Sequence, residues 1–435
     1  MRTDFTPEQL ADPATAVAEA VIRKCVHCGF CTATCPTYVL LGDELDSPRG
    51  RIYLIQNMLE TEAEPTPQVV KHIDRCLSCL SCMTTCPSGV NYMHLVDHAR
   101  AYIERRYRRP LAERAIRAML AAVLPYPRRF RFALGLARLA RPLAPIFRRT
   151  SQTRPLAAML ELAPRTLPVR TRQDAPPVVR PVGRVALLQG CAEPLLRPQI
   201  RAATLRLLAR IGYQVVSAPG EVCCGALVHH MGKEAAALEA ARRNVDAWSR
   251  LIEADGLDAI LITASGCGTT IKDYGFMLRE EPAYADRAAR ISALARDISE
   301  FLAPLDLPMP RRSGLTIAYH GACSLQHGQK LPDVPRKLLA AAGYRVVTPA
   351  EAHLCCGSAG TYNILRPELA GRLGDRKVAN LDRLDADLVA TGNIGCAVQI
   401  GMRSARPVVH VVQLIDWATG GPKPEELADL QVAEG

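Results

Sequence analysis

The chain has 435 residues, 16 cysteines and a net charge of +11, and this length allows two to four domains with ample core. It opens Met-Arg-Thr-Asp-Phe-Thr-Pro-Glu, with no apolar signal segment, and no apolar run approaches the roughly eighteen residues that a membrane span requires. These features argue against a secreted disulfide scaffold and an integral membrane protein. We therefore expect a reduced, intracellular setting, in which thiols are more often metal ligands than disulfide partners.

Helices are predicted along the first part of the chain. Asp12-Pro13 is a cap residue followed by proline, and residues 14–24 continue as good helix formers. Ser47-Pro48 repeats this signature before a second helix, and apolar residues recur at helical spacing from Val96 to Tyr107. Residues 1–109 therefore indicate a helical domain.

Two cysteine runs of the same spacing interrupt these helices. The first is Cys25-Val-His-Cys28-Gly-Phe-Cys31-Thr-Ala-Thr-Cys35-Pro36, and the second is Cys76-Leu-Ser-Cys79-Leu-Ser-Cys82-Met-Thr-Thr-Cys86-Pro87. Bacterial ferredoxins use this spacing to hold two [4Fe-4S] clusters, with the fourth cysteine of each run binding the other cluster. We therefore predict one cluster on Cys25, Cys28, Cys31 and Cys86, and a second on Cys76, Cys79, Cys82 and Cys35.

Structural zinc sites are the alternative interpretation of these runs, although zinc motifs usually spread two CxxC pairs around a longer loop. Lys24 and Arg75 directly precede the two runs. Their charge would favour reduced, more negative clusters, unless both are ordinary solvated surface charges.

A strongly basic block follows the helical domain. Residues 100–180 contain nineteen arginines, no lysine and four acidic residues, a local charge of +15. The block predicts two helices with apolar stripes, interrupted by prolines; the stripes are Ile116, Met119, Leu120 and Val123, then Phe132, Leu136, Leu139 and Leu143. We favour a connector that packs these stripes on its neighbours, with a peripheral membrane-binding helix as the alternative. Residues 173–181 then predict a proline-rich linker.

From residue 183 the sequence repeats itself. Cys191, the pair Cys223-Cys224 and Cys267 match Cys323, the pair Cys355-Cys356 and Cys396. In both copies 31 residues separate the single cysteine from the pair, and 42 or 39 residues then precede the last cysteine. Two homologous modules explain this pattern.

Each module alternates short apolar strands with helices, which predicts parallel βαβ units. In the first module we expect strands at 185–188, 214–216 and 259–263 and helices at 195–211 and 233–253. The cysteines would then follow strand ends, where open α/β sheets gather their ligands. All eight are candidate cluster or redox residues, with buried free thiols as the alternative: Cys191, Cys223, Cys224, Cys267, Cys323, Cys355, Cys356 and Cys396.

Several histidines lie near the cysteines, namely His27, His72, His229, His230 and His320. Each could donate a hydrogen bond to a cluster sulfur and raise its potential. Ordinary hydrogen-bonded loop histidines explain the pattern equally well, and we assign none of them a catalytic role.

The motifs occur in the order found in one family. Besides the cysteine runs and the Cys-Cys-Gly modules, the chain contains Asp46-Ser-Pro-Arg-Gly-Arg-Ile52, His72-Ile-Asp-Arg-Cys76-Leu-Ser-Cys79 and Thr84-Thr-Cys86-Pro-Ser-Gly-Val90. Over almost its whole length it resembles the iron-sulfur subunits of bacterial glycolate oxidases. Related architecture occurs in heterodisulfide reductase subunits, anaerobic glycerol-3-phosphate dehydrogenase subunits and lactate-utilisation proteins.

The resemblance implies an α plus α/β fold in four parts: an α-helical ferredoxin domain with two [4Fe-4S] clusters (1–109), a basic helical connector and linker (110–182), and two α/β cysteine-rich modules (183–310 and 311–435). It also implies FAD-containing partner subunits that oxidise glycolate to glyoxylate, while this chain passes electrons to a quinone or another membrane acceptor. We expect a cytoplasmic protein that is peripheral on the inner face of the cell membrane.

One departure concerns the modules. In the heterodisulfide reductase type each module ends in C-x-x-C and supplies five thiolates, whereas Thr270 and Gln399 stand at those positions here. The modules could bind further Fe-S clusters, bind nothing, or form a redox-active dithiol.

The chain itself carries no G-x-G-x-x-G dinucleotide fingerprint, so FAD is expected only on the partners. The alternative function is the iron-sulfur subunit of another flavin-linked oxidoreductase, acting on lactate, glycerol 3-phosphate or a heterodisulfide. Nucleic acid is not expected as a partner, because 5% aromatic residues give little for base stacking.

Overall fold

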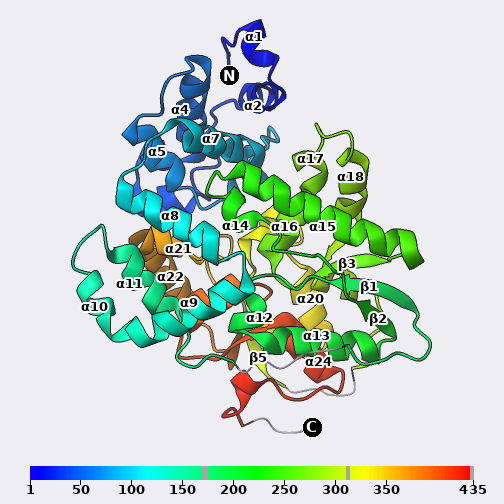
Figure 1. Ribbon diagram of the computed structural model, residues 1–435. Helices are drawn as coiled ribbons and strands as arrows, with labels where there is room; N and C mark the ends of the chain where they lie inside the picture. The colour runs from blue at the N-terminus through cyan, green and yellow to red at the C-terminus, as the bar shows by residue number, and fades with distance from the viewer. Residues whose placement is uncertain (169–174, 310–313, 432–435) are drawn as a thin grey trace.

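A computed structural model describes residues 1–168, 175–309 and 314–431 of the chain. The N-terminal helices form one end of the molecule, and two α/β modules form the other (Figure 1). A run of helices lies along one flank and joins them. In the part of the chain that the structure describes, no helix has both the length and the apolar character needed to cross a membrane.

The N-terminal domain is helical, as predicted. Its helices are α1 (Pro7–Leu10), α2 (Pro13–Lys24), α3 (Pro36–Leu41), α4 (Pro48–Glu60), α5 (Pro67–Asp74), α6 (Ser81–Thr85) and α7 (Tyr92–Arg106), with a 3-10 turn η1 (Glu44–Asp46). Five of them begin with proline, whose fixed φ suits the first helical position. The predicted caps are confirmed, because the side chains of Asp12 and Ser47 accept hydrogen bonds from the first turns of α2 and α4.

The basic block forms the helices along the flank. These are α8 (Leu111–Val123), α9 (Pro127–Ala140), η2 (Arg141–Leu143), α10 (Ala144–Phe147) and α11 (Arg154–Leu162). α8 packs only partly as expected. Leu120 is buried in one cluster with Val228 of the first module and Ile364 of the second, whereas Met119 of the predicted stripe is 41% exposed. The block therefore bridges both modules.

The predicted packing face of α9 is wrong. Phe132 is 70% exposed and Leu139 77% exposed, and Leu136 and Leu143 are also exposed. The helix packs instead through Leu134, which lies in a small core with Ala163 and Leu195. Apolar residues occur on more than one side of this helix, and their period alone does not tell which side is covered.

The first α/β module contains a parallel sheet in the order β2-β1-β3-β4. Its strands are β1 (Gly183–Leu187), β2 (Tyr213–Val216), β3 (Ala259–Ile262) and β4 (Ala295–Asp297). The helices are α12 (Glu193–Leu196), α13 (Pro198–Arg210), α14 (Ala226–His229), α15 (Glu234–Asp255), α16 (Ser265–Lys272), α17 (Tyr274–Met277), α18 (Ala285–Leu294) and α19 (Ile298–Leu302). The helix expected at 195–211 is interrupted before Pro198, because proline removes an amide donor.

The second module repeats this sheet in the order β6-β5-β7-β8. Its strands are β5 (Thr316–Tyr319), β6 (Arg345–Val347), β7 (Leu388–Thr391) and β8 (Val408–His410). The helices are α20 (Val334–Ala341), α21 (Tyr362–Leu365), α22 (Pro367–Asp382), α23 (Ile394–Gly401) and α24 (Val411–Ala418), with a π-helical turn η3 (Ser324–Gly328) and a 3-10 turn η4 (Glu425–Leu427).

The register of the two sheets also repeats. β1 pairs Leu187 with Leu261 of β3, and β5 pairs Tyr319 with Ala390 of β7. The predicted internal repeat is therefore present in the fold. Of the predicted boundaries, the one between 310 and 311 and part of the 173–181 linker lie outside the described residues.

The two modules share one hydrophobic core. Buried side chains of α13 and of α24 belong to the same cluster as both sheets. At its edge Arg206 and Arg210 both pair with the buried Asp416 of α24, at 2.6 and 3.0 Å. The strand ends of both modules are thereby held in a fixed relation to each other.

Candidate iron-sulfur centres and the cavity beside them

The first predicted ligand set lines one hollow in the N-terminal domain. Cys25 ends α2, Cys28 and Cys31 lie in the loop after it, and Cys86 ends α6. All four thiols line the same hollow, together with Cys82 from the second run. The structure thus brings together the four residues predicted for one cluster, although they come from two segments more than fifty residues apart in the chain.

The loop between Cys28 and Cys31 requires glycine. Gly29 has a φ of +85°, and a Cβ atom there would lie 2.6 Å from the Arg49 guanidinium. Arg49 crosses the loop and donates to the His27 carbonyl at 3.3 Å. A side chain at position 29 would displace this arginine and strain the backbone.

The second predicted set surrounds Cys79. The pKa of this thiol is raised well above its ordinary value by burial, and also by nearby Cys323, Cys35 and Cys76. Burial and the neighbouring Cys79, Cys76 and Cys35 likewise raise the pKa of Cys82. So many adjacent thiols are costly to ionise unless metal cations replace their protons. The donor sets therefore fit metal clusters.

A buried charge network lies beside Cys35, and sequence reasoning missed its role. Arg51 is 1% exposed, and its Nη1 atom lies 3.7 Å from the Cys35 sulfur. The same guanidinium donates to the His72 carbonyl at 2.7 Å and to the Asp46 carboxylate at 3.3 Å. Asp46 also accepts from Arg75 at 2.7 Å. Asp46, Arg51, His72 and Arg75 all lie in the two segments that carry the family resemblance, which was the available signal.

Most of the histidines near the cysteines have other partners. His72 Nδ1 lies 2.9 Å from Asp46, and His229 and His230 both approach Asp97 of α7. His27 is exposed and contacts the sulfur of Met1. Lys24 is an exposed surface charge. Of these five histidines, only His320 is grouped with cysteine sulfurs.

The second ligand set touches the second module directly. Leu77 and Cys79 pack in one buried cluster with Cys355, and Cys323 lies against it. The hydroxyl of Tyr362 donates to the Arg75 carbonyl, just before the second cysteine run, at 3.1 Å. The second predicted ligand set therefore adjoins the cysteines of the second module.

The module cysteines gather at the carboxyl ends of the strands, as predicted. In the first module the sulfurs of Cys191 and Cys223 lie 3.5 Å apart, and in the second those of Cys323 and Cys355 lie 3.7 Å apart. Hydrogen bonding with Cys191 and Cys224 lowers the pKa of Cys223 well below its ordinary range. Hydrogen bonding with Cys355 and Cys396, together with the adjacent His320, lowers the pKa of Cys356 in the same way.

All eight module cysteines line a single cavity of about 620 Å³. Its walls come from both modules and from the apolar sides of α8, α9, η2, α10 and α11. The cavity also reaches Leu77 and Ser78, beside the second ferredoxin-type set. Such a volume and lining are typical of a site for an apolar organic molecule.

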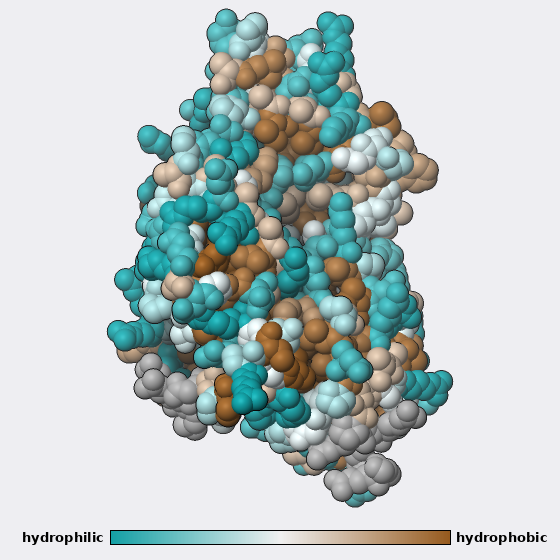
Figure 2. Space-filling view, turned by 90° about the vertical axis from the view of Figure 1, so that its right-hand side faces the viewer, coloured by the Kyte–Doolittle hydropathy of each residue, from teal (hydrophilic) through white to brown (hydrophobic). Residues whose placement is uncertain are grey.

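The distribution of apolar residues on the surface differs from one side of the molecule to another. On the side of α17 and α18, hydrophobic groups are separated by hydrophilic side chains (Figure 2). On α9, η2 and α10, by contrast, large apolar residues are exposed among arginines; they are Phe132, Leu136, Leu139, Leu143 and Ile146.

The positions that replace the fifth thiolates have structural partners. Gln399 is buried; its Nε2 donates to the Ala370 carbonyl at 3.0 Å, and its Oε1 accepts from Asn363. The Thr270 hydroxyl faces the Gly266 carbonyl of its own helix. Each side chain already has a hydrogen-bond partner within its own module.

Known protein families match the two halves of this arrangement. Residues 24–90 match a 4Fe-4S dicluster domain, and residues 185–272 and 317–401 each match a cysteine-rich domain. The chain is 42% identical to the glycolate oxidase iron-sulfur subunit of Escherichia coli, over 96% of this chain and 99% of the relative. The chain belongs to the family of glycolate oxidase iron-sulfur subunits.

Other proteins share all or part of this arrangement. The probable glycolate oxidase iron-sulfur subunit of Bacillus subtilis is 32% identical, over 92% of this chain and 95% of the relative. Lactate utilization protein A of Bacillus licheniformis is 25% identical over 54% of this chain and 99% of its own length. A crystal structure of a hypothetical Helicobacter pylori protein shares the fold, with a TM-score of 0.55 at 10% identity, over 97% of this chain and 76% of that one.

The family match and the thiol sets agree in chemistry. The dicluster domain and the cysteine-rich modules indicate Fe-S clusters. Such clusters, when bound, would each accept and release one electron at a potential set by burial, hydrogen bonds and nearby charge. The residues of this chain would supply the thiolate ligands to such clusters, and the buried Arg51 would place a positive charge beside them.

Proposed function

We propose that this chain is the electron-transfer subunit of a glycolate oxidase complex, passing electrons from FAD-containing partners to a quinone-type acceptor. The observation that carries the proposal is that each set of cysteines adjoins the next. The series begins at the exposed Cys28, runs through the two predicted [4Fe-4S] sites, and reaches the module cysteines around the cavity.

The entry point lies at the first predicted cluster. Val26 is 67% exposed and Phe30 is 64% exposed, on either side of the exposed Cys28. Exposed apolar side chains around a redox site suit a protein interface. We assign this loop to the contact with the flavin-containing partner.

The exit point is the apolar cavity. Its volume of about 620 Å³ suits the ring of an isoprenoid quinone. Its outer wall is formed by α9 and α10, whose exposed apolar residues and arginines suit insertion into an anionic lipid surface. A cytoplasmic protein attached in this way to the inner membrane face could receive quinone from the bilayer.

The electrons and protons balance. Oxidation of glycolate to glyoxylate releases two electrons and two protons, which the partner's FAD accepts. The electrons then pass singly through this chain. A quinone takes up two electrons and two protons to form the quinol, so no further oxidant is required.

Another flavin-linked donor, such as lactate or glycerol 3-phosphate, is the alternative. The lactate utilization relative matches about half of this chain, whereas the glycolate oxidase relatives match more than nine tenths of it. A heterodisulfide substrate is disfavoured because Thr270 and Gln399 replace the fifth thiolates.

The test is an anaerobic affinity purification of the chain from its native cell. We expect flavoproteins to copurify, and the eluate to reduce a dye with glycolate in preference to D-lactate, L-lactate and glycerol 3-phosphate. Cys28→Ser and Cys79→Ser should abolish quinone reduction while dye reduction at the flavin partly remains. Purification of the chain alone, or unchanged quinone reduction in both variants, would contradict the proposal.

A further inference from the structure

The two modules differ at one buried position next to their cysteines. The backbone N–H of Leu188 donates to Leu261 at 3.0 Å in the first module, and that of His320 donates to Ala390 at 2.8 Å in the second. Because Leu261 and Ala390 are equivalent in the sheet register, Leu188 and His320 occupy the same place. An imidazole therefore stands where the first module has an alkyl side chain.

His320 has no ordinary polar partner. The side chain is 2% exposed, and among the described residues neither ring nitrogen has an oxygen or nitrogen partner. Burying two polar nitrogens in this way is unfavourable unless something else binds them. The histidine is therefore poised for a ligand that the protein chain itself does not supply.

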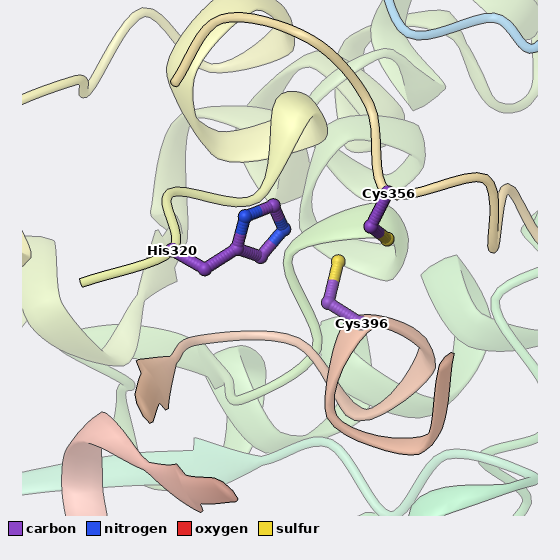
Figure 3. A group of neighbouring side chains, drawn as sticks. All are labelled: His320, Cys356 and Cys396. Carbon is purple, nitrogen blue, oxygen red and sulfur yellow. The ribbon is translucent and has the colours of Figure 1, made fainter. Parts of the chain in front are cut away.

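The ring faces two cysteines. Figure 3 shows His320, which directly follows β5, directed toward two sulfurs: that of Cys356, in the loop between β6 and α21, and that of Cys396 on α23. One donor atom from each of these three residues lies within 4.8 Å of the other two. Donors bound to one metal at the usual lengths of about 2.0–2.3 Å come within this separation. The remaining thiols, Cys323 and Cys355, lie beside them.

The surroundings favour anionic sulfur. Lys377 is 2% exposed, its ammonium donates to the Glu351 carbonyl at 2.8 Å, and its charge interacts with Cys356, Cys355 and Cys396. In the first module the polar side chains beside the cysteine pair are neutral: Asn244 donates to the Cys223 carbonyl at 3.3 Å and Tyr274 donates to the Cys224 carbonyl at 2.8 Å. The second site thus combines thiols, an imidazole and a buried cation.

We propose that His320 is a nitrogen ligand to a metal centre that Cys356 and Cys396 also bind, so that the second module has mixed nitrogen and sulfur ligation and the first has sulfur ligands alone. The metal is a thiophilic one, either iron in a cluster or a single zinc ion, since both accept imidazole with thiolate. If it is iron, replacing thiolate by neutral imidazole raises its reduction potential. Because of this higher potential, electrons would reside preferentially on the centre in the second module, next to the cavity. This inference does not depend on the identity of the donor substrate.

The test uses the full chain, purified anaerobically with its partners from cells supplied with 15N-histidine. Iron, zinc and acid-labile sulfide are counted per chain. A histidine nitrogen ligand is detected by its 15N coupling in pulsed EPR for iron, or by imidazole scattering in X-ray absorption for zinc. In the wild type we expect metal beyond the roughly eight irons of two [4Fe-4S] clusters. Extra iron with matching sulfide identifies a cluster, and about one zinc identifies a single ion. Either metal should have a histidine nitrogen ligand.

His320→Leu gives the second module the residue that the first already tolerates, and should abolish this nitrogen signal and lower the metal content. His320→Gln, which keeps a polar side chain, should have the same effect. His327→Leu is the matched control, because His327 is a buried histidine of the same module whose nitrogens already contact Thr84 and the His353 carbonyl. The nitrogen signal of His327→Leu should equal that of the wild type. About eight irons with no zinc in the wild type, or a nitrogen signal that persists in both His320 variants, would overturn the proposal.

Discussion

Arg51 is predicted to set the potential of the centre that contains Cys35. Its guanidinium is buried and lies 3.7 Å from the Cys35 sulfur. Arg51→Met removes this positive charge, whereas Arg51→Lys keeps a charge but loses the planar fork that joins Asp46, Thr37 and the His72 carbonyl. Comparing the reduction potentials of the two variants separates the effect of the positive charge from the effect of the hydrogen-bonded packing.

The magnitude follows from the distance. A unit charge acting across about 8 Å, from the guanidinium to the centre of a bound cluster, at an effective dielectric constant of about 20 changes the energy of one electron by ~2 kcal/mol. For a one-electron couple this corresponds to ~90 mV, because 59 mV is a tenfold change in equilibrium constant. Loss of the positive charge destabilises the reduced state, so the potential falls.

The assay is an EPR-monitored redox titration of the anaerobic protein. In Arg51→Met one of the two ferredoxin-type signals should shift down by ~90 mV, and in Arg51→Lys by less than about a third of that. Arg49→Met is the control, because this partly exposed arginine lies over the first set and solvent screens its charge. Unchanged potentials in Arg51→Met, or an upward shift, would refute the reasoning.

Three further predictions follow from buried or exposed groups. Asp74 pairs with Arg109, Arg117 and Arg366 and so joins the N-terminal domain, α8 and the second module. Asp74→Asn should lower the free energy of unfolding by about 3–5 kcal/mol in urea titrations. These arginines hold the pKa of Asp74 well below its ordinary value despite its burial, so the difference from wild type should shrink only as the pH falls below about 4; a constant difference would contradict this. Burial lowers the pKa of His410 to about 4. Its stabilisation is therefore present above its unfolded pKa of about 6.5 and is lost as the pH falls, which makes wild type lose about 2 kcal/mol more than His410→Gln between pH 7 and 5. Parallel pH curves for the two proteins would exclude this role. Phe132→Asp with Leu139→Asp should weaken binding to anionic vesicles at least about tenfold in a sedimentation assay, whereas Val179→Asp, at another exposed site, should not; equal binding by all three proteins would remove α9 as the membrane contact.

The sequence predicted most of the fold because its signals are local. Cap residues followed by proline located α2 and α4, and the cysteine repeat located both modules before any strand was seen. β4 and β8 were not predicted, since three-residue strands carry no usable period. The packing side of α9 was misjudged because covered and exposed apolar residues share one helical spacing.

The sequence predicted which cysteines could bind clusters, but it did not predict which side chains surround those cysteines. The spacing of Cys25, Cys28 and Cys31 predicts cluster binding by itself, although the ligand assignment stays a prediction. That Arg51 lies beside Cys35 depends on how α4 packs, which no local pattern shows. Likewise His320 resembled other loop histidines in the sequence, and only the fold shows that its nitrogens lack ordinary partners.

The central claim is that electrons from glycolate pass through this chain on their way to quinone. Rapid freezing of the anaerobic complex after mixing with glycolate, followed by EPR, tests it most directly. We expect the Fe-S signals of this chain to become reduced within one turnover, and the signals beyond the second set to stay oxidised in Cys79→Ser. Fe-S signals that remain oxidised in the wild type while quinone is still reduced at the normal rate would contradict the account.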